Sequence, residues 1–571
     1  MADSELLAND QLADPPLVAQ TARALSSTST IALVAMAPLL LEACGGDSAP
    51  TPTPTPIASP PPPPVAVITA TEASRFLGQA SMGATKAEIT SLTTTGYSGW
   101  LDTQLGLARP LKCWDFLANN GYNVAANISN TNGYEPMVWN QLIASSDALR
   151  QRVGLALLDM IVVSIDGFAS QWKAQVMAAF FDVLWDNAFG NYRDLIEAVS
   201  TNIGMGYYLT FLGNTKANAA TGSVPDENYA RELMQLFTIG LYQLNMDGSL
   251  VLSGGNPVET YSQADVSGLA RVWTGYTYGS ADNSTPDRQR LPMLVNAAQH
   301  ETGVKTFLGT TIPAGTDGVA SRKLALDTIF AHANVAPFVS KQLIQHLVTS
   351  NPSPAYIGRV AAVFANNGNG VRGDIKAVIR AILTDSEARS AANLTSTTFG
   401  KLREPVVRLT QWARAFGVTS PTNLWPFGNT SSTATRLGES PGHSPSVFNF
   451  FRPGYTPGGP ITAAGLVAPE FQITNEPSVI AYINYMQTLI VGGAGEAKAD
   501  YTAVLALVAD SQALLAELNL VLAAGQISAA TIASMKTALD TIATTTTAGQ
   551  NNRLYAAIVL VMAAPEYLVL K

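Results

Sequence analysis

A proline-rich segment determines where the folded body of this chain can begin. Residues 48–64 have the sequence "SAPTPTPTPIASPPPPP", which alternates Thr with Pro and ends in five consecutive prolines. Proline has no backbone N–H, and its ring holds φ near about −65°, so neither a helix nor a β-ladder continues through such a run. The segment is instead typical of an extended spacer of about 3.1 Å per residue. We therefore expect the globular body to occupy residues 66–571.

The residues before this spacer indicate export. Residues 31–41, "IALVAMAPLLL", form an apolar run that suits a signal peptide and falls short of the ~20 residues needed to span a bilayer. The following "LEACGG" resembles a bacterial lipoprotein signal, in which Cys44 becomes the lipidated first residue. Glu42 and four acidic residues ahead of the apolar run depart from that pattern, and the alternative is a buried helix with an incidental cysteine.

These features predict a specific organisation of the N-terminal part. We expect a signal peptide region at 1–43, followed at 44–65 by the lipidated cysteine and a disordered Pro/Thr-rich linker. The protein would then be an exported, membrane-anchored lipoprotein, in the periplasm or at the cell surface. No other apolar run reaches about 18 residues, so we predict no transmembrane helix.

The composition argues against nucleic acid as a partner and against stabilisation by several disulfides. Only 13% of residues are charged, against about 25% in a typical soluble protein, which suits a protein outside the cytosol. The net charge of −9 argues against nucleic acid, because phosphate binding needs a basic surface. The two cysteines, Cys44 and Cys113, cannot form a disulfide framework. With Cys44 modified, Cys113 would be a lone, buried thiol.

Helical periodicity dominates the body. Thr69 with Glu72, and Thr85 with Glu88, have the spacing of capping boxes at helix starts. Residues 147–163 and 373–383 place apolar side chains on one helical face, and residues 510–543 indicate two helices that meet near Gly525. We predict a mainly α fold with a large multi-helix globular body. A separate C-terminal helical subdomain at 480–571 is one further alternative.

One region departs from this helical pattern. Residues 244–315 are rich in Gly, Asn, Asp and Pro, and Asp247-Gly248 is a favourable hairpin turn. We therefore expect a small turn-rich insert with short strands in the helical frame.

Charge is concentrated at "PDENYARELMQLFTIGL", residues 225–241. A helix over 227–241 would place Glu227, Arg231 and Glu232 on one polar arc, with Tyr229, Leu233 and their neighbours on the other side. One interpretation is a solvated helix face, whose exposed ion pairs contribute about 0.3–0.5 kcal/mol. The other is a polar site around which the fold is built.

The spacing of the four histidines in the sequence does not predict a local metal site. No two of them stand at ligand spacing, so a metal site would require residues far apart in the sequence to converge, and we predict no metal or cofactor. His346 is expected on the exposed polar side of a helix. His300 and His443 lie beside turn-rich or Pro- and Gly-rich loops, where sites are often built. No nucleophile elbow, phosphate loop or zinc-binding helix motif is present.

Several long motifs are similar to those of a known family. They are "ENYARELMQLFTIGL", "HETGVKTFLG", "VAPFVSKQLIQHLVTSNPSPAYIGRVAAVF", "KLREPVVRLTQWARAFG", "SVFNFFRPGY" and "APEFQITNE". Together they resemble the bacterial domain of unknown function 1800 family from about Arg75 to the C-terminus. The resemblance implies an exported, mainly helical protein without an established activity. It also implies a possible exported partner encoded nearby, because members' genes often stand beside those of a second exported family.

The resemblance also bears on individual residues. The family's Glu-Asn-x-Ala-Arg-Glu signature corresponds to Glu227, Asn228, Arg231 and Glu232, so the resemblance supports the polar site as much as the solvated face and leaves both interpretations open. Many relatives carry a Trp-His-Asn-His segment upstream. The corresponding "FFDVLWDNAFGNYRDL" contains no histidine, which argues against a histidine–metal mechanism here.

Two functions are compatible with the sequence. The leading hypothesis is an exported cell-envelope lipoprotein that binds a partner protein or an envelope polymer. The alternative is an envelope hydrolase, which requires acid/base groups near a positively charged residue. Its candidate catalytic residues are Glu227, Glu232 and Asp265 as acid or base, Arg231 as the positioning group, and His300 or His443 as an assisting group.

Overall fold

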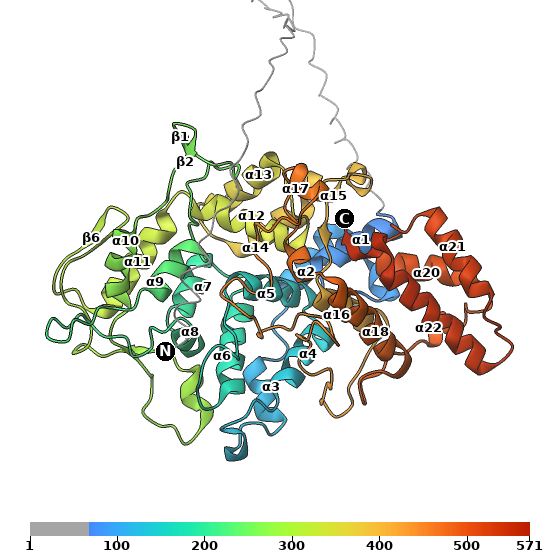
Figure 1. Ribbon diagram of the computed structural model, residues 1–571, viewed down its shortest axis with the longest axis horizontal. Helices are drawn as coiled ribbons and strands as arrows, with labels where there is room; N and C mark the ends of the chain where they lie inside the picture. Colours follow the sequence, from blue (N-terminus) through green and yellow to red (C-terminus); the bar gives the residue numbers. More distant parts are fainter. Residues whose placement is uncertain (1–67) are drawn as a thin grey trace, which may run out of the picture. The chain divides into compact units, whose positions relative to one another are not determined.

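The first two helices begin at the predicted capping boxes. The computed structural model describes residues 68–571 (Figure 1). α1 (Ala70–Ala80) follows Thr69, whose backbone N–H donates to the Glu72 carboxylate at 2.9 Å. α2 (Lys86–Gly106) follows Thr85, whose N–H donates to Glu88 at 2.7 Å. Both boxes satisfy N–H groups that a helix start leaves without an intrahelical partner.

The remaining helices confirm the predicted mainly α fold, and their buried side chains form one large apolar core. By its contacts, Ala66–Lys571 is a single compact unit. These helices are α3 (Cys113–Asn119), α4 (Tyr134–Ala144), α5 (Ala148–Met160), α6 (Lys173–Asp186), α7 (Tyr192–Val199), α8 (Ile203–Tyr208), α9 (Asn228–Gln235), α10 (Gln263–Ala270), α11 (Gly318–Ala331), α12 (Val335–Leu347), α13 (Pro354–Ala365), α14 (Ile375–Thr384), α15 (Ser386–Arg389), α16 (Pro405–Ala415), α17 (Pro460–Ala463), α18 (Glu476–Gly492), α19 (Thr502–Leu505), α20 (Ser511–Ala523), α21 (Ala529–Asp540), α22 (Thr547–Ala563) and α23 (Pro565–Leu568).

Helix α5 lies in the middle of the core. The sequence predicts one apolar face, but every residue of α5 except Asp159 is buried, because α1, α2, α4, α6 and α12 all pack against it. The helix therefore carries Arg150, Gln151 and Arg152 into the interior together with its leucines. Buried polar groups are stable only with partners inside the protein. This requirement shapes the candidate site.

The turn-rich insert is confirmed, with short antiparallel strand pairs. The Asp247-Gly248 turn is also present: the Ser249 N–H donates to Asp247 Oδ1 at 3.0 Å, and Gly248 has φ of 76°. The insert also contains α10, a short helix that the turn-rich sequence pattern does not indicate. The paired strands are β1 (Leu252–Ser253) with β2 (Asn256–Pro257), β3 (Tyr276–Thr277) with β4 (Leu294–Val295), and β5 (Lys305–Phe307) with β6 (Thr310–Ile312).

The C-terminal helices end in a strand pair that joins distant parts of the chain. The predicted break between α20 and α21 is confirmed, because Ala524 and Gly525 both adopt positive φ and Ser528 caps α21. At the end of the chain, β8 (Val569–Leu570) pairs antiparallel with β7 (Lys401–Leu402). The C-terminus is therefore bound to the segment that carries Lys401.

In residues 68–571 no helix combines the length and the apolar character required to cross a membrane. The predicted signal peptide region, Cys44 and the proline-rich linker lie outside the described residues.

Candidate functional site

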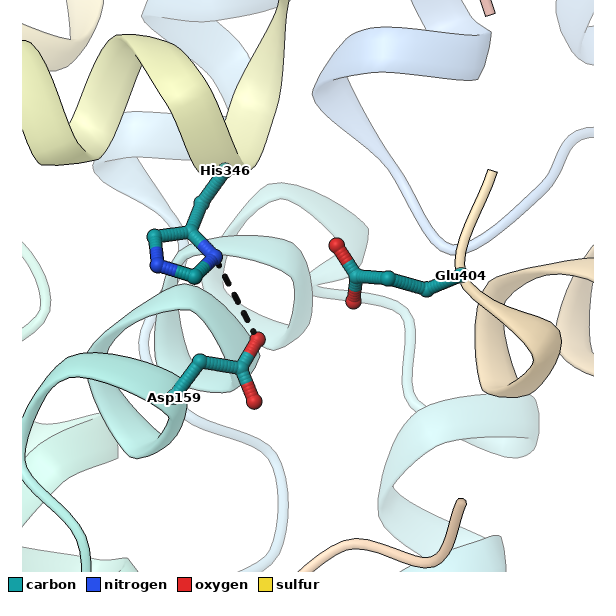
Figure 2. A group of neighbouring side chains, drawn as sticks. All are labelled: Asp159, His346 and Glu404. Atoms are coloured by element: carbon teal, nitrogen blue, oxygen red, sulfur yellow. Dashed lines mark ion pairs between the residues drawn. The ribbon is translucent and has the colours of Figure 1, made fainter. Parts of the chain in front are cut away.

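Three ionisable side chains meet inside the core (Figure 2). Asp159 lies near the C-terminal end of α5, His346 near the C-terminal end of α12, and Glu404 directly precedes α16. Figure 2 shows these side chains pointing toward one another from three separate segments. One nitrogen or oxygen atom from each side chain lies within 4.8 Å of the other two. We call these residues the buried triad.

The contact between Asp159 and His346 is not an ordinary salt bridge. His346 Nδ1 lies 3.6 Å from Asp159 Oδ2, which is too far for a hydrogen bond. Burial, with a contribution from the nearby Lys401 charge, lowers the pKa of His346 to about 3, so the imidazole is neutral at pH 7. Burial, with contributions from nearby carboxylates, raises the pKa of Asp159 well above its usual range. The pair therefore lacks the opposite charges that would hold it together.

Lys401 connects the buried triad to the surrounding segments. Its Nζ donates to Glu404 Oε1 at 2.7 Å and to the His346 backbone oxygen at 2.8 Å, and it pairs with Glu470 Oε1 at 2.9 Å. Burial alone would lower the pKa of Lys401, but Glu404 and Glu470 outweigh it and raise that pKa. Burial likewise opposes ionisation of Glu404, yet Lys401 and Arg152 lower its pKa to about 2. Glu404 is therefore a carboxylate at neutral pH.

Only one oxygen of each triad carboxylate is satisfied by a hydrogen bond. Asn449 Nδ2 donates to Asp159 Oδ1 at 2.7 Å, and Lys401 binds Glu404 Oε1. Arg152 donates to the His346 backbone oxygen at 2.5 Å, but its Nη1 remains 3.8 Å from Glu404 Oε2. Within the buried triad, the atoms left without a hydrogen-bond partner are Asp159 Oδ2, Glu404 Oε2 and His346 Nδ1, all of them buried. Beside the triad, Arg152 Nη1 and Glu470 Oε2 are buried without a hydrogen-bond partner as well.

A fourth carboxyl group near the buried triad is in the opposite protonation state to Glu404. Glu439 Oε2 accepts the Val406 N–H at 3.0 Å. Burial, reinforced by Glu404, raises the pKa of Glu439 to about 8, so it is predominantly neutral at pH 7. Carboxyl groups with widely separated pKa values are typical of acid/base or cation-binding sites. Chemically, this arrangement can hold a cation or exchange a proton.

A second polar site surrounds His443. Its Nδ1 lies 2.7 Å from Asp166 Oδ2, and its Nε2 lies 3.4 Å from Glu135 Oε1. Burial would lower the pKa of His443, but Glu135 and Asp166 outweigh it and raise that pKa. Glu135 also lines an open cavity of about 490 Å³. We call this space the Glu135 cavity.

The predicted charged helix is shorter than expected. It spans α9 rather than residues 227–241, because the Ile239 and Gly240 N–H groups both donate to the Met234 carbonyl and Gly240 adopts φ of 71°. This turn ends the regular helix before Thr238, which is buried.

The charges on α9 contact another helix. Arg231 Nη2 lies 3.0 Å from Glu227 Oε2, and the side chains of Gln263 and Ser267 on α10 donate to the Glu227 carboxylate at 2.7 and 2.5 Å. Glu232 is more isolated: its Oε2 is buried without a hydrogen-bond partner, and burial raises the pKa of Glu232 to about 7.

Asp265 and His300 bind other partners. Asp265 completes a capping box with Ser262 at the start of α10, and its Oδ1 accepts the Leu308 N–H at 2.6 Å. His300 is buried, with Nδ1 2.9 Å from the Thr274 carbonyl. Of the candidate catalytic residues, the structure joins Glu227 to Arg231, while Asp265, His300 and His443 each contact different groups.

The segment compared above with Trp-His-Asn-His, residues 180–195, runs from the second half of α6 into α7, and Asp182 on α6 has structural partners. Asp182 accepts the Cys113 and Trp114 N–H groups at 2.7 and 3.0 Å, at the start of α3, and pairs with Arg109 at 2.6 Å. Cys113 is buried, as predicted, and burial raises the pKa of its thiol.

The prediction that His346 is exposed is wrong. The residue is 7% exposed, because the polar side of α12 faces the buried triad instead of water, and the Phe451 ring lies 6.4 Å from the imidazole. The other triad residues and Lys401 were not predicted as site residues at all. A usable signal was present, however: the motifs quoted for the family resemblance contribute His346, Lys401, Glu404, Asn449 and Glu470.

The fold and this cluster define a mainly helical protein with ionisable side chains at its centre. The family described as "Protein of unknown function (DUF1800)" matches residues 75–569, and the chain belongs to that family. No curated protein and no solved structure matched the chain.

Replacing Lys401 should strongly destabilise the protein. Lys401→Met leaves Glu404 and Glu470 buried without their counter-charge, so we expect the free energy of unfolding to fall by about 3–5 kcal/mol in urea denaturation. The control is Lys323→Met, which breaks an exposed pair with Asp327 and should cost at most about 1 kcal/mol. Equal effects of the two substitutions would contradict this account of the core.

Glu232 should make stability depend on pH. The unfolded carboxyl ionises near pH 4.5 and the folded one near pH 7, so wild-type stability should decline as pH rises between these values. Gln does not titrate. The free energy of unfolding of Glu232→Gln minus that of the wild type should therefore rise by about 3 kcal/mol between pH 4.5 and pH 8. Urea denaturation at both pH values measures this difference, and exposed Glu476→Gln is the control. A difference that does not change with pH would refute the burial effect.

Proposed function

We propose that this protein is an exported lipoprotein, anchored through Cys44, whose helical body binds a hydroxyl-rich envelope polymer in the Glu135 cavity. The apolar leader, the cysteine that follows it and the proline-rich spacer support export and anchoring. The low content of charged residues is consistent with an extracytoplasmic surface.

The side chains that line the Glu135 cavity are the main support for a polysaccharide ligand. Amide, hydroxyl and carboxylate side chains line an open space of about 490 Å³, and Tyr122 adds an aromatic ring. Such groups can donate to and accept from the hydroxyls of a polysaccharide, while an aromatic ring packs on its apolar C–H faces. The lining residues are Asn120, Gly121, Tyr122, Asn127, Thr131, Asn132, Gly133, Glu135 and Pro136.

The wall of this cavity is held in place by its own hydrogen bonds. Asn127 Nδ2 donates to the Tyr122 carbonyl at 3.0 Å, and Asn132 Nδ2 donates to Asn127 Oδ1 at 3.0 Å. Gly133 adopts φ of 88°, and a Cβ there would lie 2.4 Å from the Tyr122 ring. A preorganised wall loses less conformational entropy on binding, which favours recognition of an extended polymer.

Hydrolysis of the same polymer is the second candidate function. The position of His443 favours this function. Its Nδ1 contacts Asp166, and its Nε2 faces Glu135, which lies on the cavity wall. In this role Glu135 would act as the general acid or base, and His443 would position its carboxyl group. This assignment keeps His443 from the sequence-based candidates and replaces the α9 carboxylates with Glu135.

Binding to the Glu135 cavity can be tested by cosedimentation with insoluble envelope polysaccharide. We expect Asn132→Ala and Glu135→Gln to weaken binding about tenfold each, because the first removes a hydrogen-bonding side chain and the second replaces a charged acceptor with a neutral amide. Asn369→Ala, in an exposed loop away from the cavity, should bind as the wild type does. Equal binding by all four proteins would reject this cavity as the site.

The same experiment separates the remaining functions. Release of new reducing ends by the wild type, lost in Glu135→Gln, would establish hydrolysis. If the wild type binds no polysaccharide but retains the separately purified exported protein encoded beside it, the function is partner binding and the polymer proposal fails.

The anchor is tested independently of the ligand. Metabolic labelling with a palmitate analogue should label the wild type and leave Cys44→Ala unlabelled, because the Cys44 thiol is the proposed acylation site. Cys113→Ala should still be labelled, since Cys113 is buried in the folded body. Label that persists in Cys44→Ala, or an unlabelled wild type, would disprove the anchor.

A further inference from the structure

We propose that Asp159, His346 and Glu404 form a binding site for one divalent transition-metal ion. The buried triad supplies one imidazole nitrogen and two carboxylates from three segments that meet in the core (Figure 2). This inference concerns the interior of the protein and does not depend on the polymer proposed for the Glu135 cavity.

Unsatisfied buried atoms are the main evidence for a bound ion. Asp159 Oδ2, His346 Nδ1 and Glu404 Oε2 have no hydrogen-bond partner, and their side chains are only 5, 9 and 1% exposed. A buried polar atom without a partner costs about 1–3 kcal/mol, and more when the group is charged. Three such atoms on neighbouring side chains indicate a common missing partner. A cation satisfies all three at once, because each can offer a lone pair.

The spacing of the ligand atoms suits a metal ion. Zinc-like ions bind nitrogen and oxygen ligands at about 2.0–2.2 Å, which places neighbouring ligand atoms about 3–3.6 Å apart. Asp159 Oδ2 and His346 Nδ1 are already 3.6 Å apart. Since the ligand atoms of the whole triad lie within 4.8 Å, coordination requires side-chain shifts of about 1 Å.

Neighbouring residues already orient the two carboxylates. Asn449 binds Asp159 Oδ1 and Lys401 binds Glu404 Oε1, so in each case the other oxygen is the one left free. Lys401 and Arg152 bind the His346 backbone oxygen and so fix the main chain from which the imidazole extends, although they do not contact the ring itself through these bonds. Partners that hold the non-ligating atoms of metal ligands are typical of metal sites, where they set ligand direction.

The charge balance leaves room for a cation. A metal ion binds a deprotonated carboxylate, so binding would release the Asp159 proton to solvent. The carboxylates of Asp159, Glu404 and Glu470 would then carry one more negative charge than Lys401 and Arg152 neutralise. The imidazole favours Mn²⁺, Fe²⁺ or Zn²⁺ over Ca²⁺ and Mg²⁺, which prefer oxygen ligands alone. Three protein ligands also leave at least one coordination position for water or a substrate, the pattern of catalytic rather than structural metal centres.

Metal binding can be measured on the purified full-length protein. After chelator treatment, we expect the wild type to bind one equivalent of Zn²⁺ or Mn²⁺ per chain by calorimetry and elemental analysis. The ion should raise the thermal unfolding midpoint, because binding to the folded state stabilises it. Asp159→Asn and His346→Gln should each weaken the metal affinity at least tenfold, while the matched controls Asp182→Asn and His332→Gln should not.

If the variants do not fold, the proposal can still be tested on the wild type by the absorption spectrum of bound Co²⁺. Co²⁺ bound at the buried triad should show d–d absorption bands of a site with nitrogen and oxygen ligands, and Zn²⁺ should compete for it. Absence of metal uptake by folded wild type would overturn the proposal and leave a water molecule as the common partner. Unchanged metal affinity in folded Asp159→Asn and His346→Gln would overturn it as well.

Discussion

Lys401 is the positive charge around which the centre of the fold is organised. Its ammonium group contacts the His346 carbonyl, Glu404 and Glu470, which belong to α12, the start of α16 and the short helical turn Pro469–Ile473. Its own strand pairs with the last strand of the chain. A buried charge is tolerated only when its partners are all in place. Formation of this centre is therefore coupled to the folding of distant segments, including the C-terminus.

The features predicted correctly from the sequence depend on nearby residues. The capping boxes at Thr69 and Thr85 and the turn at Asp247-Gly248 need only residues within a few positions of one another, so their patterns are visible in the sequence. The mainly helical fold follows from many such local signals. The helix over 227–241 was predicted too long, because the turn at Gly240 that ends it is not evident from hydrophobic periodicity.

The buried triad could not be located in this way. Asp159, His346 and Glu404 are separated by many helices, and a helical wheel does not distinguish a polar face in water from one that meets another polar group. The error for His346 follows directly from this ambiguity. The useful signal was the set of long family motifs, since His346, Lys401, Glu404, Asn449 and Glu470 come from four of them. Charged or polar residues in otherwise apolar motifs are good candidates for a shared interior site.

The buried triad and the Glu135 cavity are joined by the same two segments. Asp159 and Asp166 lie on one segment, and His443 and Asn449 lie on the other. Asp159 accepts a hydrogen bond from Asn449, and Asp166 contacts His443. Between these contacts, the Ile165 N–H donates to the Gly442 carbonyl at 2.9 Å. The two sites are distinct in chemistry, but these contacts hold the segment that carries Asp159 and Asp166 against the segment that carries His443 and Asn449.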